Sequence, residues 1–90
     1  MSKAVVDPNE LRRFAADLRK FNTDVQGQMT RLGASLGALQ QTWRDQEQAK
    51  FAEEFEQTMR SLQRFLKASE VFVPFLMRKA ERIDDYLNQR

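Results

Sequence analysis

The sequence predicts an all-α protein: an antiparallel hairpin of two long helices, which pairs with a second hairpin as a four-helix bundle. Three observations indicate this fold. Apolar residues recur at spacings of three and four along two long segments, as on a helix face and not as in a strand. A short segment with turn signals, residues 42–45, separates the two. The later segment also carries a second apolar row, which a two-helix hairpin cannot bury.

The first helix is expected from about residue 8 to about residue 41. Its start is the sequence DPNE, in which Asp7 can cap the helix, Pro8 suits the first position, and Glu10 stands three residues after the cap, as in a capping box. At 1.5 Å per residue this helix would be about 50 Å long. Its apolar row runs through Leu11, Phe14, Leu18, Phe21, Val25, Leu32 and Leu39, with Met29 and Leu36 beside it.

The sequence GASLGALQQTWRD places the chain reversal at residues 42–45. Gly33 and Gly37 weaken the end of the first helix, and Asp45 followed by Gln48 repeats the capping pattern. A single continuous helical rod is the alternative to a hairpin.

The second helix is expected from about residue 46 to about residue 88. Pro74 interrupts its hydrogen bonds, but the apolar row continues in phase on both sides, so we expect a kink near Pro74 and not an end. Folding the chain about residue 43 brings Leu18 near Ser69 and leaves the helix beyond about residue 79 as a projecting tail. The apolar row consists of Phe51, Phe55, Met59, Leu62, Leu66, Ser69, Val73, Leu76, Ala80, Ile83 and Leu87.

The second apolar row of this helix predicts a homodimer. It lies about 80° away from the first row on a helical wheel. Exposed phenylalanines in one row would form a patch that monomers rarely show, whereas a four-helix bundle would bury it. A sister hairpin or a secreted cargo protein is the alternative partner for this row, which consists of Phe65, Ala68, Phe72 and Phe75.

The composition excludes most catalytic and metal chemistry. The chain has no Cys and no His, which removes disulfides, thiolate metal sites and the usual catalytic bases and nucleophiles. Glu53, Glu54 and Glu56 are interpreted as a solvated helix face, and there is no glycine-rich phosphate loop. We therefore expect a protein that is not an enzyme and has no catalytic residue, no metal and no cofactor.

The charge and hydropathy patterns exclude two classes of partner. The 15 Lys and Arg nearly balance the 13 Asp and Glu, and they are spread along the chain, whereas a nucleic-acid footprint is a clustered basic patch. No stretch is apolar enough for membrane insertion, and the start MSKAVVDPNE lacks the apolar core of a signal peptide. Export would therefore need a route without a cleaved leader.

The sequence LQQTWRDQEQAKFAEEF, together with the hairpin pattern, resembles the WXG (ESAT-like) proteins of bacterial type VII secretion. Trp43 matches the family tryptophan, and Phe51 and Phe55 match the apolar positions that follow it. Asp45 stands where the family has glycine, so the motif here is W-x-D. Tyr86 matches the tyrosine of the C-terminal export signal, but Arg90 stands where the family has an acidic residue.

The resemblance implies a non-enzymatic secretion substrate, or an escort for a larger secreted cargo, present in the bacterial cytoplasm before export. It implies a dimer with itself or with a sister WXG-like protein, and a secretion ATPase as a further partner. Trp43 then has two possible roles. It packs at the open end of the hairpin, or it forms with Asp45 a cleft that the ATPase recognises. A structural subunit of a needle or filament is the alternative function. A membrane-surface helix fits poorly, because acidic and basic residues are intermixed.

Overall fold

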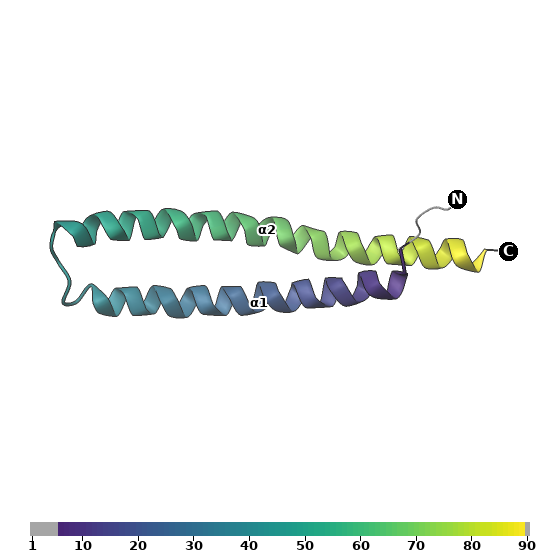
Figure 1. Cartoon of the computed structure of the whole chain (residues 1–90), viewed down its shortest axis with the longest axis horizontal. Coiled ribbons are helices and arrows are strands. Elements are labelled where there is room, and N and C mark those ends of the chain that lie inside the picture. The colour runs from purple at the N-terminus through teal and green to yellow at the C-terminus, as the bar shows by residue number, and fades with distance from the viewer. Residues whose placement is uncertain (1–5, 90) are drawn as a thin grey trace.

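The computed structural model describes residues 6–89, and within them the regular structure consists of two helices. Helix α1 spans Pro8–Leu39 and helix α2 spans Gln46–Asn88. They run antiparallel as a hairpin about 70 Å long, with the loop at one end and the start of α1 beside the last third of α2 at the other (Figure 1). The predicted all-α helical hairpin is confirmed.

Both helices begin at an aspartate cap. The Oδ1 atom of Asp7 accepts a hydrogen bond from the N–H of Asn9 at 2.9 Å, and Pro8 occupies the first position of α1. The Oδ1 atom of Asp45 accepts from the N–H of Gln48 at 3.0 Å. In each case the carboxylate satisfies a donor that the first turn leaves without a partner, and its negative charge favours the positive end of the helix dipole.

Helix α1 ends at Leu39, two residues before the expected residue 41. The hydrogen bonds tighten there: the N–H of Gln41 bonds to the carbonyl of Ala38 and that of Thr42 to the carbonyl of Leu39, each at 3.1 Å. A tightened turn of this kind is a common way for an α-helix to end. Helix α2, by contrast, continues through Pro74 as far as Asn88.

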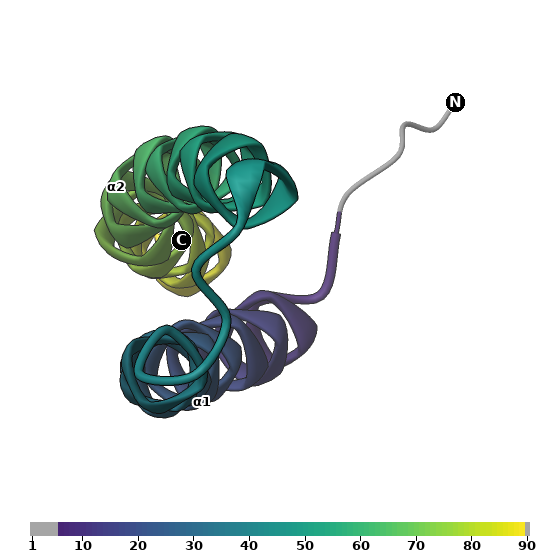
Figure 2. The ribbon, with the colours of Figure 1, turned by 90° about the vertical axis from the view of Figure 1, so that its left-hand side faces the viewer.

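The buried core lies mainly in the half of the hairpin away from the loop. Seen from the loop end, α1 and α2 form one layer of two rods, and the last part of α2 lies closer to α1 than its start does (Figure 2). Small residues permit this close approach. The buried apolar residues of the described chain are Ala15, Leu66, Val73 and Ala80, and the buried polar residues are Asn22 and Ser69.

The seam of α1 differs from the expected one. Phe14 and Phe21, which were expected in the seam, are 58% and 49% exposed, whereas Ala15 and Asn22, each one position further along, are buried. The short side chains let the helices approach, and the large rings lie at the flank of the contact. In α2 the middle of the expected row is buried against α1, whereas Phe51 and Leu87 at its two ends are 42% and 51% exposed.

A few side-chain pairs join the two helices. Ser69 bonds to Asn22, which lies one helical turn from Leu18, the expected neighbour of Ser69, and Phe21 meets Phe65. The contact between the helices also extends beyond residue 79, because Ala80 is fully buried and Arg12 forms an ion pair with Asp84. The projecting tail therefore begins only after Asp84.

Candidate protein-binding surface

Three aromatic rings form a cluster at the bend. The ring centroids of Trp43 and Phe51 lie 5.6 Å apart, and those of Phe51 and Phe55 lie 5.9 Å apart. The backbone N–H of Trp43 donates a hydrogen bond to the carbonyl of Leu39 at 3.0 Å. This bond fixes the tryptophan backbone at the end of α1. Trp43 is half-buried, while Phe51 remains 42% exposed. The tryptophan therefore packs against the first turns of α2, and the cluster still presents an apolar edge to solvent.

Asp45 links this cluster to the start of α2. As the cap of α2, it fixes the point at which the chain leaves the extended segment after Trp43 and enters the helix. Aspartate is among the preferred capping residues, so it can make the bend where the family has glycine.

Exposed phenylalanines from both helices form one face of the hairpin. In α2, Phe65, Phe72 and Phe75 are 47%, 51% and 51% exposed, and Ala68 between them is also exposed. Phe21 of α1 meets Phe65 edge-on, with ring centroids 6.2 Å apart and planes at 89°. This edge-to-face arrangement is a favourable geometry for aromatic pairs.

Phe14 extends the same face. It lies seven residues before Phe21, and Phe72 lies seven residues after Phe65, so in antiparallel helices both are displaced by two turns toward the same end. We call Phe14, Phe21, Phe65, Phe72 and Phe75 the aromatic face. The contribution of α1 to this face was not predicted from the sequence, because its phenylalanines were assigned to the seam.

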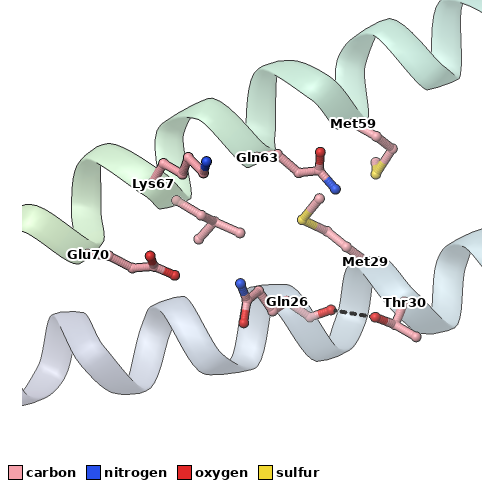
Figure 3. A pocket seen from close by; sticks show the side chains of 8 residues that line it. Gln26, Met29, Thr30, Met59, Gln63, Lys67 and Glu70 are labelled. Atoms are coloured by element: carbon pink, nitrogen blue, oxygen red, sulfur yellow. Dashed lines mark hydrogen bonds between the residues drawn. The ribbon is translucent and has the colours of Figure 1, made fainter.

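The opposite side of the hairpin carries a groove of about 510 Å³. Figure 3 shows side chains of α1 and α2 lining it, with the hydroxyl of Thr30 donating to the backbone carbonyl of Gln26 at 3.1 Å. Apolar side chains form its floor, and polar or charged side chains form its rims. This side of the hairpin can therefore remain in contact with water. The lining residues are Gln26, Met29, Thr30, Met59, Gln63, Leu66, Lys67 and Glu70.

The tail of α2 presents the candidate export residue. Asp84 is held by Arg12, whereas Tyr86 is 71% exposed and Leu87 is 51% exposed. Arg90, the position at which the export signal departs from the family pattern, lies outside the described residues. The geometry therefore places Tyr86 on a segment that adds little to the hairpin core.

The charged groups form local surface pairs. Lys20 bonds to Asp24 and Arg60 bonds to Glu56, each at 2.9 Å and one turn along the same helix. The hydrogen bond from Asp24 and its negative charge raise the pKa of Lys20 above its ordinary value. Within residues 6–89, no group of three or more acidic, His or Cys side chains could hold a metal ion, and neither helix is apolar and long enough to cross a membrane.

Comparison with known proteins relates this geometry to a family. The model of the WXG100 family, described as proteins of 100 residues with WXG, matches residues 4–86. The crystal structure of the secreted protein EsxB from Bacillus anthracis strain Sterne is 28% identical and has a TM-score of 0.79, covering 98% of this chain and 100% of that chain. A proline-to-alanine variant of EsxB is also 28% identical, with a TM-score of 0.84 over 96% of this chain and 100% of that chain. No curated protein matches the sequence significantly.

The family match and the structural likeness agree on the same architecture. The match includes Trp43, the bend and almost the whole length of both helices. The EsxB chains share the hairpin from end to end. The chain therefore belongs to the WXG100 family, the ESAT-like helical hairpins associated with type VII secretion, and like them it is not an enzyme.

Proposed function

We propose that the protein is a type VII secretion substrate, or an escort for a larger secreted cargo, and that it works as a homodimer joined through the aromatic face. The observation that carries this proposal is the exposure of five phenylalanines on one side of the hairpin. Contiguous apolar patches of this kind mark interaction sites in soluble proteins. The likeness to EsxB, described as a secreted protein, supports the link to export.

The exposed area of the chain supports a partner of its own size. The solvent-accessible surface is 7190 Å² for a chain of 10.6 kDa. A compact monomer of that mass would expose about 5,500 Å², so the surplus is about 1,700 Å². Each partner in a standard protein interface buries about 800 Å². A second copy presents the same apolar face and can cover the first symmetrically, which closes the assembly at two chains.

The native chain is expected to be a closed dimer at micromolar concentration, with twice the 10.6 kDa mass of one chain. Light scattering coupled to size exclusion measures this mass directly. An assembly that grows with concentration would favour the alternative function, a structural subunit of a needle or filament. A stable, non-aggregating monomer would contradict the homodimer and favour a sister WXG-like hairpin or a cargo protein as the partner.

The bend cluster and the tail are proposed to serve export. Trp43 and Phe51 present an apolar edge beside Asp45, and such an edge suits recognition by a secretion ATPase. Tyr86 lies at the other end of the hairpin, exposed and beyond the ion pair of Asp84. Before export the protein would reside in the bacterial cytoplasm.

A chain that ends at Asp84 is expected to fold and dimerise normally but to lose export. The deleted residues follow the Arg12–Asp84 ion pair, and Tyr86 and Leu87 among them are 71% and 51% exposed, so the core should not change. Immunoblots of the culture medium and the cells measure the exported fraction, and circular dichroism measures helix content. Gln89→Ala is the matched control, because it alters the same segment but keeps Tyr86. Unchanged export of the shortened chain would remove Tyr86 from the signal, and a loss of helix beyond the deleted residues would show that the tail is structural.

A further inference from the structure

Two polar side chains meet in the middle of the hairpin core. Ser69 is fully buried and Asn22 is 7% exposed. The hydroxyl of Ser69 donates a hydrogen bond to the Oδ1 atom of Asn22 at 2.8 Å. Ser69 lies between Leu66 and Val73 in the buried row of α2, whereas Asn22 also borders a pocket lined by Arg19, Gln26 and Glu70. A buried polar group requires such a partner, because it has given up its bonds to water.

Each of these residues is a polar member of a series spaced by seven residues that is otherwise apolar over residues 15–36 of α1 and over residues 55–83 of α2. In α1, Asn22 interrupts a series of apolar side chains that also face α2, namely Ala15, Met29 and Leu36. In α2, Ser69 interrupts a second such series, namely Phe55, Leu62, Leu76 and Ile83.

The apolar series do not select one alignment of the helices. A slide of seven residues moves α1 along α2 by about 10 Å and again places apolar side chains opposite apolar ones. The end of α1 can adapt to such a slide, because Gly33 and Gly37 weaken its last turns. What such a slide cannot preserve is the bond between Asn22 and Ser69. Both polar groups would then be buried against apolar neighbours.

We propose that the Asn22–Ser69 pair selects the alignment of α1 with α2. A single buried polar residue has this role in coiled coils, where it specifies the register of the strands. The same alignment brings the phenylalanines of the two helices together in the aromatic face. Asn22 is next to Phe21 in the sequence, and Ser69 lies one helical turn from Phe65. The proposal rests on the proposed function only for this last consequence.

Distances between two labels on one chain test the alignment. The chain has no cysteine, so Arg31→Cys and Val71→Cys provide two unique and exposed sites for spin labels, one on each helix. Labelled chains are diluted into an excess of unlabelled chains, and pulsed electron paramagnetic resonance then reports only distances within a chain. The native background should give one narrow distance. In Asn22→Leu with Ser69→Ala, a second distance population should appear, corresponding to a slide of about 10 Å along the helix axis.

Two controls separate alignment from general disturbance. The exchanged variant, Asn22→Ser with Ser69→Asn, retains a polar pair and should keep one distance. Lys20→Leu with Asp24→Ala removes an exposed bonded pair and should also keep one distance. A single native distance in the Asn22→Leu, Ser69→Ala variant would overturn the proposal, as would its failure to form helices. Light scattering on the same samples reports dimerisation separately, so a monomer with two distances would support the alignment and contradict only the homodimer.

Discussion

Replacing Phe65 and Phe72 by glutamine is expected to convert the proposed homodimer into helical monomers at micromolar concentration. Both rings are about half-exposed in the hairpin, so each can still bury about half of its surface against a partner. Full burial of a phenylalanine contributes about 1.5–3 kcal/mol. Four half-buried rings in a symmetric dimer therefore contribute about 3–6 kcal/mol, and their loss should raise the Kd by about 10²–10⁴-fold. Sedimentation velocity over a concentration series measures this change.

Met77→Gln is the matched control for this experiment. Met77 is 38% exposed on the same helix, but it lies about 120–160° from the three phenylalanines of α2 on a helical wheel and so points away from the aromatic face. It should leave both the mass and the helix content unchanged. If the Phe65→Gln, Phe72→Gln variant remains a dimer, the interface lies on another side of the hairpin. If Met77→Gln also dissociates, the effect reflects general loss of apolar surface and not this face.

The hairpin itself could be predicted from the sequence, because its signals are local. The aspartate caps, the three-and-four spacing of apolar residues and the short break are all contained within a few turns of chain. The row of α2 was predicted correctly as the side that faces α1, including Ser69. The resemblance to the WXG family was also confirmed, by a match that covers residues 4–86.

The seam of α1 could not be predicted from hydrophobicity alone. Phe14 and Phe21 are more apolar than Ala15 and Asn22, so a count of apolar positions places the rings in the contact. The helices instead approach over the small side chains, because close packing depends on size as well as on apolar character. The burial of Asn22 depends on Ser69, which lies 47 residues away in the sequence, and a pattern within one helix cannot contain that information.

The candidate site was only partly accessible to sequence analysis for the same reason. The row of α2 could be identified because it is surplus to a two-helix contact. The contribution of α1 becomes visible only once Ala15 and Asn22 occupy the seam and leave Phe14 and Phe21 at its flank. A signal did exist in the matching seven-residue spacings, Phe14 to Phe21 and Phe65 to Phe72, which place two pairs at the same levels of an antiparallel hairpin.

Leu66→Ala is expected to cause a large loss of stability. Leu66 is 2% exposed and is the largest of the four buried apolar residues in the described chain. Truncating a buried leucine to alanine costs about 2–5 kcal/mol, because apolar contacts are lost and a cavity remains. Met29 and Met59 line the groove beside Leu66, and flexible methionines can move into part of the cavity. We therefore expect the lower part of this range, about 2–3 kcal/mol.

For a domain of this size such a loss lowers Tm by about 8–24 °C. Thermal melts followed by circular dichroism measure it, with all variants at one chain concentration, because the Tm of a dimer depends on concentration. Leu87→Ala is the control: the same atoms are removed from a side chain that is 51% exposed in the tail, so the loss should stay below about 1 kcal/mol. Equal losses in the two variants would contradict a core centred on Leu66. They would instead imply that a partner buries the tail. Leu87 is half-exposed in the single chain, so only contacts with a second chain could make its truncation as destabilising as that of Leu66, which is buried between α1 and α2.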